Sequence, residues 1–223
     1  NIQTGLTEGT NGFLYGTTSA TASVGSNFGT VFRLDKKGSN FATLHTFTST
    51  ASDGRNPLGT LAQASDGYFY GTTGNGGSNG QGTVFRMDGA GNDYQIIHHF
   101  ASAANDGHNP VAGLIEGSDG ALYGTTTAGG SNNFGTVFRL DKAGAEYLIL
   151  HHFPSFANPA AKLVEGGDGQ IYGTTPSGTS NRIGTVFCLA KDGSNYRVLK
   201  QFLDVPDGAN PLGGLLERSG TLY

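Results

Sequence analysis

The chain has 223 residues, of which 38 are glycine and 13% are charged, for a formal net charge of -4. This composition excludes the dense Lys/Arg face of a nucleic-acid-binding protein, and no apolar run approaches the roughly 20 residues of a membrane-spanning helix. The single cysteine, Cys188, excludes an internal disulfide and a cysteine-based metal site. We therefore expect no nucleic-acid partner, no membrane insertion, no metal and no other cofactor.

An internal repeat organises the whole chain. The strings YGTT and GTVF alternate, beginning at Tyr15, Gly29, Tyr70, Gly82, Tyr123, Gly135, Tyr172 and Gly184. Successive GTVF strings are 53, 53 and 49 residues apart. The short interval has a local cause, because Phe153 is five residues before Asn158 whereas Phe100 is nine residues before Asn109. Loops tolerate deletions and strands do not, so the missing residues mark a loop.

Each unit is predicted to contain four short strands in succession. In the third unit we expect strands at 110–117, 121–126, 135–141 and 146–153, separated by an SDG turn, a glycine-rich loop at 127–134 and a KAG turn. Short runs of β-branched, aromatic and aliphatic residues bounded by Gly, Asp and Asn are typical of strands. Asp-Gly supplies the positive φ that tight hairpins require.

The predicted strands carry apolar residues on both faces. In GTVFRL we expect Val137 to point to one side, with Phe138 and Leu140 in opposite or mixed orientations, which suits a sheet packed between two similar sheets. Four-stranded sheets repeated every 49–55 residues predict an all-β fold, a β-propeller of four-stranded blades. A parallel β-helix is the alternative, but its coils are shorter and lack regular hairpin turns.

Residues 1–223 form a single predicted repeat domain of four units and a partial fifth. The units occupy residues 1–55, 56–108, 109–157, 158–209 and 210–223. Both ends of the chain carry the first two strands of a unit, so they duplicate rather than complement each other. We expect the sequence to be an excerpt of a longer chain; closure of four blades with redundant ends is the alternative.

The pattern DGxNPxxGLxxGSDGxLYGTTxxGGxxxxGTVFRLDxxGxxYxxLHxF runs through essentially the whole chain. It resembles the Gloeobacter/Verrucomicrobia (GloVer) tandem repeat of bacterial surface and secreted proteins, and the blade is similar to NHL and SMP-30 type repeats. The resemblance implies a propeller-like array outside the cytoplasm, often attached to a surface anchor. It brings no catalytic residues to carry over.

Histidines recur at one strand end, where LHTF, IHHF and LHHF place His45, His98 and His151, and Lys200 takes their place in unit four. Imidazoles repeated once per blade could bind metal or sugar. Radiating blades hold them too far apart to share a metal ion, whose ligands lie about 2 Å away. These three histidines are binding candidates. The alternative is a half-buried imidazole that is bonded to a backbone group.

An Arg and an Asp two residues apart recur in FRLD and FRMD. The pairs are Arg33–Asp35, Arg86–Asp88 and Arg139–Asp141. Residues i and i+2 share a strand face, so they can pair. In unit four both are replaced, by Cys188 and Ala190, and this joint loss predicts a structural salt bridge.

The string DGxNP recurs at Asp53, Asp106 and Asp207, whereas unit three keeps only Asn158 and Pro159. Asp-Gly and Asn-Pro favour turns. Calcium binding is the alternative, but Ca²⁺ takes about six to eight oxygens, and one Asp and one Asn per loop supply too few. We therefore predict turns.

The loops between YGTT and GTVF, such as 74–81 and 127–134, are rich in Gly, Ser and Asn. No lysine follows them and no helix is expected there, so they are not phosphate-binding loops. They lie at one rim of each blade and suit weak, repeated carbohydrate contacts, with solvated turns as the alternative. The binding candidates in these loops are Asn79, Gln81, Asn132, Asn133, Phe134, Asn181 and Arg182.

Two further columns are expected to be structural. The tyrosine of YGTT should lie in the core, and the glycine after it should admit a neighbouring sheet. A glutamate column comprises Glu8, Glu116, Glu165 and Glu217, with Ala64 in unit two. A carboxylate pair for glycoside hydrolysis needs unique residues, so repeat-equivalent glutamates favour a scaffold role.

These patterns predict a non-catalytic extracellular or cell-surface propeller that binds glycan or a surface protein through repeated rim loops. The first alternative is a structural, scaffolding repeat of a cell-surface or filamentous assembly. The second is a polysaccharide-active lyase or hydrolase, whose site would lie on the central channel at residues that differ among blades. Lys162 and Arg218 are unusual charges near the inner strands and would be the first residues to test for that activity.

Overall fold

The computed structural model describes residues 5–19, 28–50, 52–101, 105–178, 183–203 and 207–223. Within these ranges every regular element is a strand, β1 to β22, which confirms the all-β prediction. Over the same ranges no helix has the length and apolar character needed to cross a lipid bilayer.

Four antiparallel sheets of four strands follow one another along the chain. Blade one contains β1 (Thr7–Glu8), β2 (Leu14–Thr18), β3 (Thr30–Leu34) and β4 (Ala42–Thr46). Blade two contains β6 (Ala62–Gln63), β7 (Phe69–Thr73), β9 (Thr83–Met87) and β10 (Gln95–His99). Blade three contains β12 (Ile115–Glu116), β13 (Leu122–Thr126), β15 (Thr136–Leu140) and β16 (Tyr147–His152). Blade four contains β17 (Val164–Glu165), β18 (Ile171–Thr175), β19 (Thr185–Leu189) and β20 (Arg197–Gln201).

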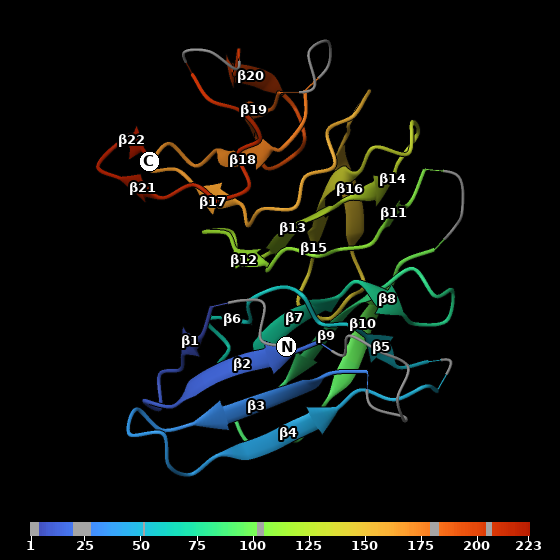
Figure 1. Ribbon diagram of the computed structural model, residues 1–223, viewed down its shortest axis with the longest axis vertical. Coiled ribbons are helices and arrows are strands. Elements are labelled where there is room, and N and C mark those ends of the chain that lie inside the picture. Colours follow the sequence, from blue (N-terminus) through green and yellow to red (C-terminus); the bar gives the residue numbers. More distant parts are fainter. Residues whose placement is uncertain (1–4, 20–27, 51, 102–104, 179–182, 204–206) are drawn as a thin grey trace.

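The four sheets radiate from their short inner strands. Strand order follows the sequence in every sheet, so the chain runs outward through each blade and then returns to begin the next. Figure 1 shows β1, β6, β12 and β17 toward the centre and left of the view, with β4, β10, β16 and β20 around its bottom, right and top. Radiating four-stranded sheets are the blades of a β-propeller, so the predicted fold is confirmed.

Each blade has a turn end and a loop end, because antiparallel order places successive connections at alternate ends. The SDG turns and the turns that follow the third strands lie at the turn end. The loops 74–81 and 127–134 and the connections between blades lie at the loop end. Small sheets tie these loops together, β5 (Gly54–Arg55) with β8 (Asn75–Gly76) and β11 (Gly107–His108) with β14 (Ala128–Gly129). After blade four comes the hairpin of β21 (Glu217–Arg218) and β22 (Thr221–Leu222).

The core clusters lie between neighbouring blades. In β15, Val137 packs in the cluster shared with blade four, whereas Phe138 and Leu140 pack in the cluster shared with blade two. All three side chains are fully buried. Burying an aliphatic or aromatic side chain of this size contributes about 1.5–3 kcal/mol, so each strand stabilises two interfaces. The two-faced strand predicted from GTVFRL is therefore confirmed.

The glycine of YGTT has a different role from the predicted one. A Cβ at Gly124 would lie 2.6 Å from the Phe138 ring and 2.7 Å from Leu114. Both side chains belong to blade three, and Phe138 is the cross-strand partner of Gly124. The glycine therefore makes room for a phenylalanine of its own sheet, not for a neighbouring sheet.

The tyrosine of YGTT is buried, as predicted, in the first three blades. Tyr70 and Tyr123 are fully buried, and their hydroxyls donate to Asp66 and Asp119 of the SDG turns, both at 2.8 Å. Burial and the neighbouring carboxylate raise the pKa of both phenols, which stay neutral donors. In blade four, Tyr172 is only partly buried but makes the same bond.

Each Asn-Pro pair fastens the start of one blade to the previous blade. Asn109 has a φ of 57°, a left-handed conformation that asparagine adopts more readily than most residues. Its N–H donates to the Gln81 carbonyl of blade two at 2.9 Å. Pro110 then packs against Gly82, where a Cβ would come within 2.7 Å of the Pro110 ring. The same arrangement recurs at Asn56, Asn158 and Asn210. The pair is thus a turn, as predicted, and also an inter-blade contact.

Candidate functional site

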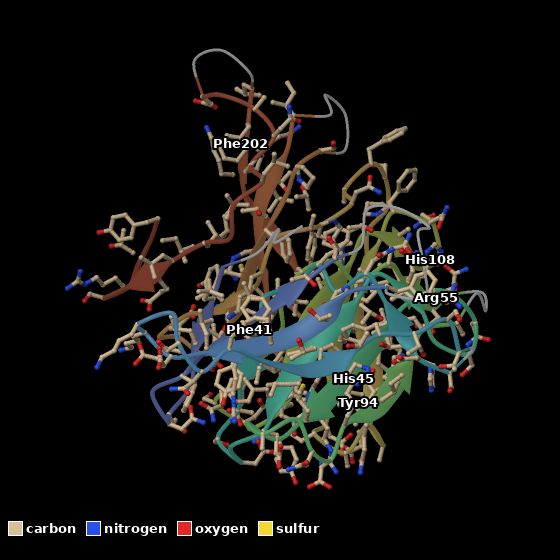
Figure 2. The ribbon with its side chains drawn as sticks, turned by 60° about the horizontal axis from the view of Figure 1, so that its bottom comes forward. Phe41, His45, Arg55, Tyr94, His108 and Phe202 are labelled. Atoms are coloured by element: carbon tan, nitrogen blue, oxygen red, sulfur yellow. The ribbon has the colours of Figure 1, made fainter. Side chains whose placement is uncertain are left out.

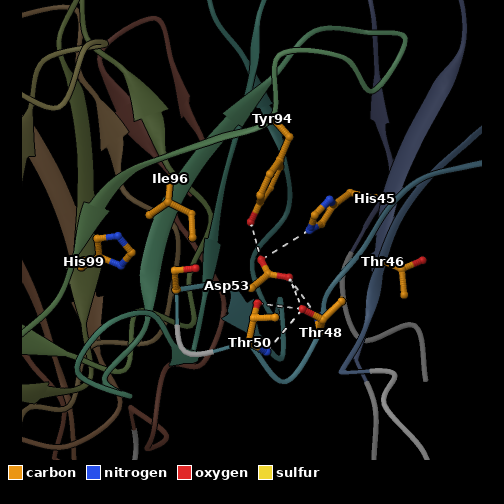
Figure 3. A pocket seen from close by; sticks show the side chains of 9 residues that line it. His45, Thr46, Thr48, Thr50, Asp53, Tyr94, Ile96 and His99 are labelled. Atoms are coloured by element: carbon orange, nitrogen blue, oxygen red, sulfur yellow. Dashed lines mark hydrogen bonds and ion pairs between the residues drawn. The ribbon is translucent and has the colours of Figure 1, made fainter.

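A pocket lies at the loop end, between the outer strands β4 of blade one and β10 of blade two. It has a volume of about 480 Å³. Its lining comes from both strands and from the connection between the blades: His45, Thr46, Thr48, Thr50, Ser52, Asp53, Tyr94, Ile96 and His99. Figure 3 shows Tyr94, His45 and Thr48 directed toward Asp53. We call this the inter-blade pocket.

Asp53 is the centre of the inter-blade pocket. Its Oδ2 accepts hydrogen bonds from the Thr48 N–H at 2.8 Å and from the Thr48 hydroxyl at 3.2 Å. Its Oδ1 accepts from the Gly54 N–H at 2.8 Å and from the Tyr94 hydroxyl, in the next blade, at 2.9 Å. Both carboxylate oxygens are therefore occupied by donors of the chain itself, and the aspartate joins two blades.

His45 packs against the same tyrosine. Its ring stacks on Tyr94 with centroids 3.6 Å apart and an interplanar angle of 13°, and it meets Phe47 edge-on at 4.7 Å. Figure 2 shows His45 and Tyr94 side by side. The Nε2 atom lies 3.4 Å from Asp53 Oδ1. Burial lowers the pKa of His45 despite this carboxylate, so the neutral imidazole is favoured.

The arrangement recurs between blades two and three. His98 stacks on Tyr147 at 3.9 Å, and the Tyr147 hydroxyl donates to Asp106 at 2.8 Å. Asp106 also accepts from the N–H groups of Ala101 and Gly107, both at 2.7 Å. Burial raises the pKa of Tyr147, as it does that of Tyr94, so both phenols remain donors.

The arrangement of histidine, tyrosine and aspartate is altered at the third junction and in blade four. Between blades three and four, His151 stacks on Tyr196 at 3.6 Å, but the shortened loop provides no aspartate there. In blade four, Lys200 replaces the histidine and forms an ion pair with Asp207 at 2.6 Å. The aspartate bridge is therefore present at the first two junctions, and the histidine–tyrosine stack is present at all three.

The predicted backbone bond to the histidine column is wrong. The Nε2 atoms of His45, His98 and His151 are buried and have no hydrogen-bond partner among the described residues. The histidines that bond the backbone are His99 and His152, one residue later, whose Nδ1 atoms accept from Ser78 and Ser131 N–H groups at 3.2 Å. A β-bulge lies immediately before the first histidine of each pair, and the two successive histidines then point to opposite faces of the strand.

The predicted rim residues mostly hold their own loops in shape. The Asn79 amide donates to the Phe100 carbonyl at 3.3 Å, and Asn133 Oδ1 accepts from the Gly129 N–H at 3.0 Å. The Gln81 carbonyl takes part in the Asn-Pro contact described above. Phe134 lies beside Phe156, with ring centroids 4.9 Å apart, and Asn132 is exposed. Asn181 and Arg182 lie outside the described residues.

One rim loop contacts the histidine that follows the histidine column. Loop 74–81 contacts His99 through Ser78, and His99 lines the inter-blade pocket. His45 therefore lines the pocket directly, whereas this loop is connected to it through the His99 side chain. The residues that sequence reasoning missed are Tyr94 and Thr48, together with the role of Asp53. The signal was present, because a tyrosine stands four residues before His98 and before His151, and the aspartates occur one unit earlier.

The predicted Arg–Asp salt bridge within FRLD is wrong. Asp35 Oδ1 accepts from the N–H groups of Lys37 and Ser39, at 2.9 and 2.8 Å. Arg33 donates instead to the Gly89 carbonyl of blade two at 2.8 Å. The cause is that β3 ends at Leu34, so the aspartate lies in the turn and no longer shares a strand face with the arginine.

The pair of charges that is replaced jointly in one blade is a glutamate and a lysine. Glu116 contacts Lys142 at 2.5 Å and accepts from the N–H and hydroxyl of Ser65, in the previous blade, both at 2.7 Å. In blade two the strand register places Gln63 in the glutamate column, so the prediction of Ala64 is wrong by one residue. Gly89 stands where Lys142 does, so acid and base disappear together.

Comparisons with known proteins identify the family. The sequence profile of the Gloeobacter/Verrucomicrobia repeat matches residues 1–223. The chain belongs to this family. The resemblance seen in the repeated strings is thereby confirmed. A comparison with curated proteins found no match.

Solved structures similar to this GloVer repeat protein share its fold. A chain of a nidogen–laminin complex has a TM-score of 0.56 at 17% identity, over 85% of this chain and 63% of that one. An alpha-L-arabinofuranosidase of Clostridium thermocellum has a TM-score of 0.54 at 19% identity, over 96% and 78%. TolB of Acinetobacter baumannii has a TM-score of 0.56 at 17% identity, over 88% and 44%. The GloVer chain thus spans less than two thirds of the nidogen–laminin chain and less than half of TolB.

Proposed function

We propose that this GloVer repeat protein is a non-catalytic binding module that acts outside the cell or at its surface and holds neutral glycan segments in its inter-blade pockets. The observation that carries the proposal is the lining of the first pocket, where hydroxyls, a neutral imidazole and an aromatic ring surround a carboxylate that already has its partners. Sugars are recognised by such a combination, because their hydroxyls exchange hydrogen bonds and their C–H faces pack on rings.

The lining offers accessible polar groups to a ligand, although the Thr50 hydroxyl also exchanges a hydrogen bond with the Thr48 hydroxyl at 2.9 Å. The side chains of Thr46, Thr50 and Ser52 are exposed at the mouth, and Ile96 and His99 are half-buried beside them. Hydroxyls both donate and accept, so they match the mixed donors and acceptors of a sugar. Pockets of about 300–1,000 Å³ with a few convergent polar groups are typical of small-ligand sites.

The same chemistry favours binding over hydrolysis at this pocket. Glycoside hydrolysis uses two carboxyl groups on opposite sides of the scissile bond. Asp53 is the only carboxylate among the described lining residues, and each of its oxygens already accepts hydrogen bonds from the protein. Its role is to hold the pocket in shape.

Repetition supports multivalent use. The second junction keeps His98, Asp106 and His152, but Ala101 stands where Thr48 offers a hydroxyl, so its affinity should be lower. Weak sites on one rigid array gain avidity when a long polymer reaches several of them.

A scaffolding role is the second candidate, because three kinds of blade-to-blade contact recur along the chain. They are the Asn-Pro contact, the histidine–tyrosine stack and the Ser–Glu–Lys cluster. A regular array of this kind suits a spacer or sheath. Purified protein that polymerises into filaments would favour this role over ligand binding.

The binding proposal is tested with an array of neutral oligosaccharides, followed by calorimetric titration of any hit. Replacing the exposed hydroxyls in the double variant Thr46→Val, Ser52→Ala should weaken binding of a true ligand roughly thirtyfold, since each of the two neutral hydrogen bonds contributes about 1 kcal/mol. Thr43→Val, an exposed threonine on β4 that does not line the pocket, is the matched control. Equal affinity of the double variant and the control, or a blank array with folded protein, would reject the proposal. Cell fractionation tests the location.

A further inference from the structure

A second cavity lies on the axis of the propeller, far along each blade from the inter-blade pocket. The inner strands or inner connections of all four blades line it, and its volume is about 490 Å³. Glu8, Gln63, Glu116 and Lys162 supply one polar group from each blade. We call it the central cavity. Arg218, on the hairpin after blade four, is exposed and does not line it.

The charges of the central cavity do not cancel. Glu8 forms an ion pair with Lys36 at 2.6 Å, and Glu116 forms one with Lys142. Gln63 is neutral and exchanges hydrogen bonds with Thr10. Lys162 has no ion pair and no hydrogen bond to another described side chain. The lining itself holds two carboxylates and one ammonium. Each carboxylate is neutralised by a lysine just outside the lining, so the Lys162 ammonium is the charge left without a counter-ion among the described residues.

The position of Lys162 holds a small, uncharged residue in the other units. It stands three positions before Glu165, and the equivalent positions before the other members of the glutamate column hold Gly5, Thr60, Gly113 and Gly214. The fold accepts glycine or a short side chain at this place, so packing does not demand a lysine. A singular residue at an otherwise uniform position is what a ligand contact would produce.

The surroundings of Lys162 make its ammonium a good partner for an anion. The side chain is exposed to the cavity, yet the atoms gathered around it remove part of its hydration and lower the pKa of Lys162. An ion that is already partly desolvated loses less when it forms a contact ion pair. A single negative charge balances the site, whereas a dianion would leave an excess charge.

We propose that the central cavity binds one monoanionic, carboxylate-bearing sugar, such as a uronic acid, with its carboxylate on the Lys162 ammonium. The volume accommodates a monosaccharide ring, and the polar rim at Thr10 and Gln63 faces its hydroxyls. This site uses the inner strands alone and shares no residue with the inter-blade pocket. The proposal for the central cavity can therefore be tested independently of the proposed function.

Isothermal titration with galacturonate, galactose and inorganic phosphate tests the site on the whole chain. We expect galacturonate to saturate at one site per chain and to bind at least tenfold more tightly than galactose. Phosphate, largely a dianion at pH 8, should bind more weakly than galacturonate. Equal binding of galactose, tighter binding of phosphate, or no saturable binding of galacturonate would each overturn the proposal.

Substitution assigns the effect to one side chain. Lys162→Met should lower galacturonate affinity at least tenfold, while Lys162→Arg keeps the charge and most of the binding. Because three equivalent positions hold glycine, we expect Lys162→Met to fold, and thermal unfolding checks this. Lys37→Met removes the same charge from an exposed turn residue outside the cavity and should bind as the unmodified chain does. Folded Lys162→Met that binds as tightly as Lys37→Met would refute the assignment.

Discussion

Replacing Asp106 by alanine should strongly destabilise the junction between blades two and three. The carboxylate accepts three hydrogen bonds, from the N–H groups of Ala101 and Gly107 at 2.7 Å and from the Tyr147 hydroxyl at 2.8 Å. Alanine leaves all three donors without that partner. Tyr147 is the most affected, because it comes from the next blade and stacks on His98.

The size of the effect follows from these contacts. A hydrogen bond to a charged group contributes about 1.5–3 kcal/mol, and water can replace part of it at a half-buried site. With about 1 kcal/mol retained for each bond, the loss is about 3 kcal/mol. For a chain of this length, 1 kcal/mol shifts the melting temperature by about 2–4 °C, so the expected decrease is roughly 6–12 °C.

Urea and thermal unfolding of matched variants would measure it. Asp207→Ala is the control, because among the described residues Asp207 pairs only with the half-exposed Lys200 and should contribute less than about 1 kcal/mol. A double-mutant cycle with Tyr147→Phe isolates the inter-blade bond. If Asp106→Ala and Asp207→Ala lost equal stability, the aspartate bridge would not be what holds this junction.

Three further changes test other parts of the fold. Gly82→Ala should cost about 2–3 kcal/mol in urea unfolding, because φ is 104° and the new Cβ would lie 2.4 Å from the Thr73 carbonyl; a loss below about 1 kcal/mol would contradict this. Burial lowers the pKa of His151 from 6.5 to about 4, so the unfolded chain binds the proton more readily than the folded chain does. The stability that this histidine contributes is therefore present above pH 6.5 and is lost as the pH falls toward 4. NMR titration of His151 should show that low pKa. The free energy of unfolding of the His151→Phe variant should fall less steeply with acid than that of the unmodified chain. Titration of His151 near pH 6.5 would disprove the assignment. A double-mutant cycle between Glu116 and Lys142 should give a coupling of about 1 kcal/mol, and a value near zero would mean that their joint loss in blade two has another cause.

The fold could be predicted from the sequence because the repeat constrains it many times over. The opposed faces of Val137 and Phe138 follow from two-residue periodicity, and both proved buried on opposite sides of the sheet. The role of Gly124 could not be predicted, since strand propensity does not say whether the space beside a glycine is filled by its own sheet or by the next.

The candidate site was only partly predictable, because its residues belong to different units. The repeat identifies His45 as a recurring residue, but its neighbour Asp53 was predicted only as a turn residue and its neighbour Tyr94 was missed. A repeat read one unit at a time shows which residues are equivalent, not which column of one blade touches which column of the next. Reading each column against the following unit would have placed tyrosine beside aspartate.

The four-residue deletion in the third unit has a mechanical consequence. The third junction therefore lacks an equivalent of the aspartate that bridges each of the first two junctions. Blades three and four are joined by the histidine–tyrosine stack, the Asn-Pro contact and the Ser118–Glu165–Lys191 cluster. When the chain is pulled at its ends, the junction between blades three and four should separate first. The third and fourth blades would then move apart, while the junction between the first two blades, which encloses the inter-blade pocket, stays intact.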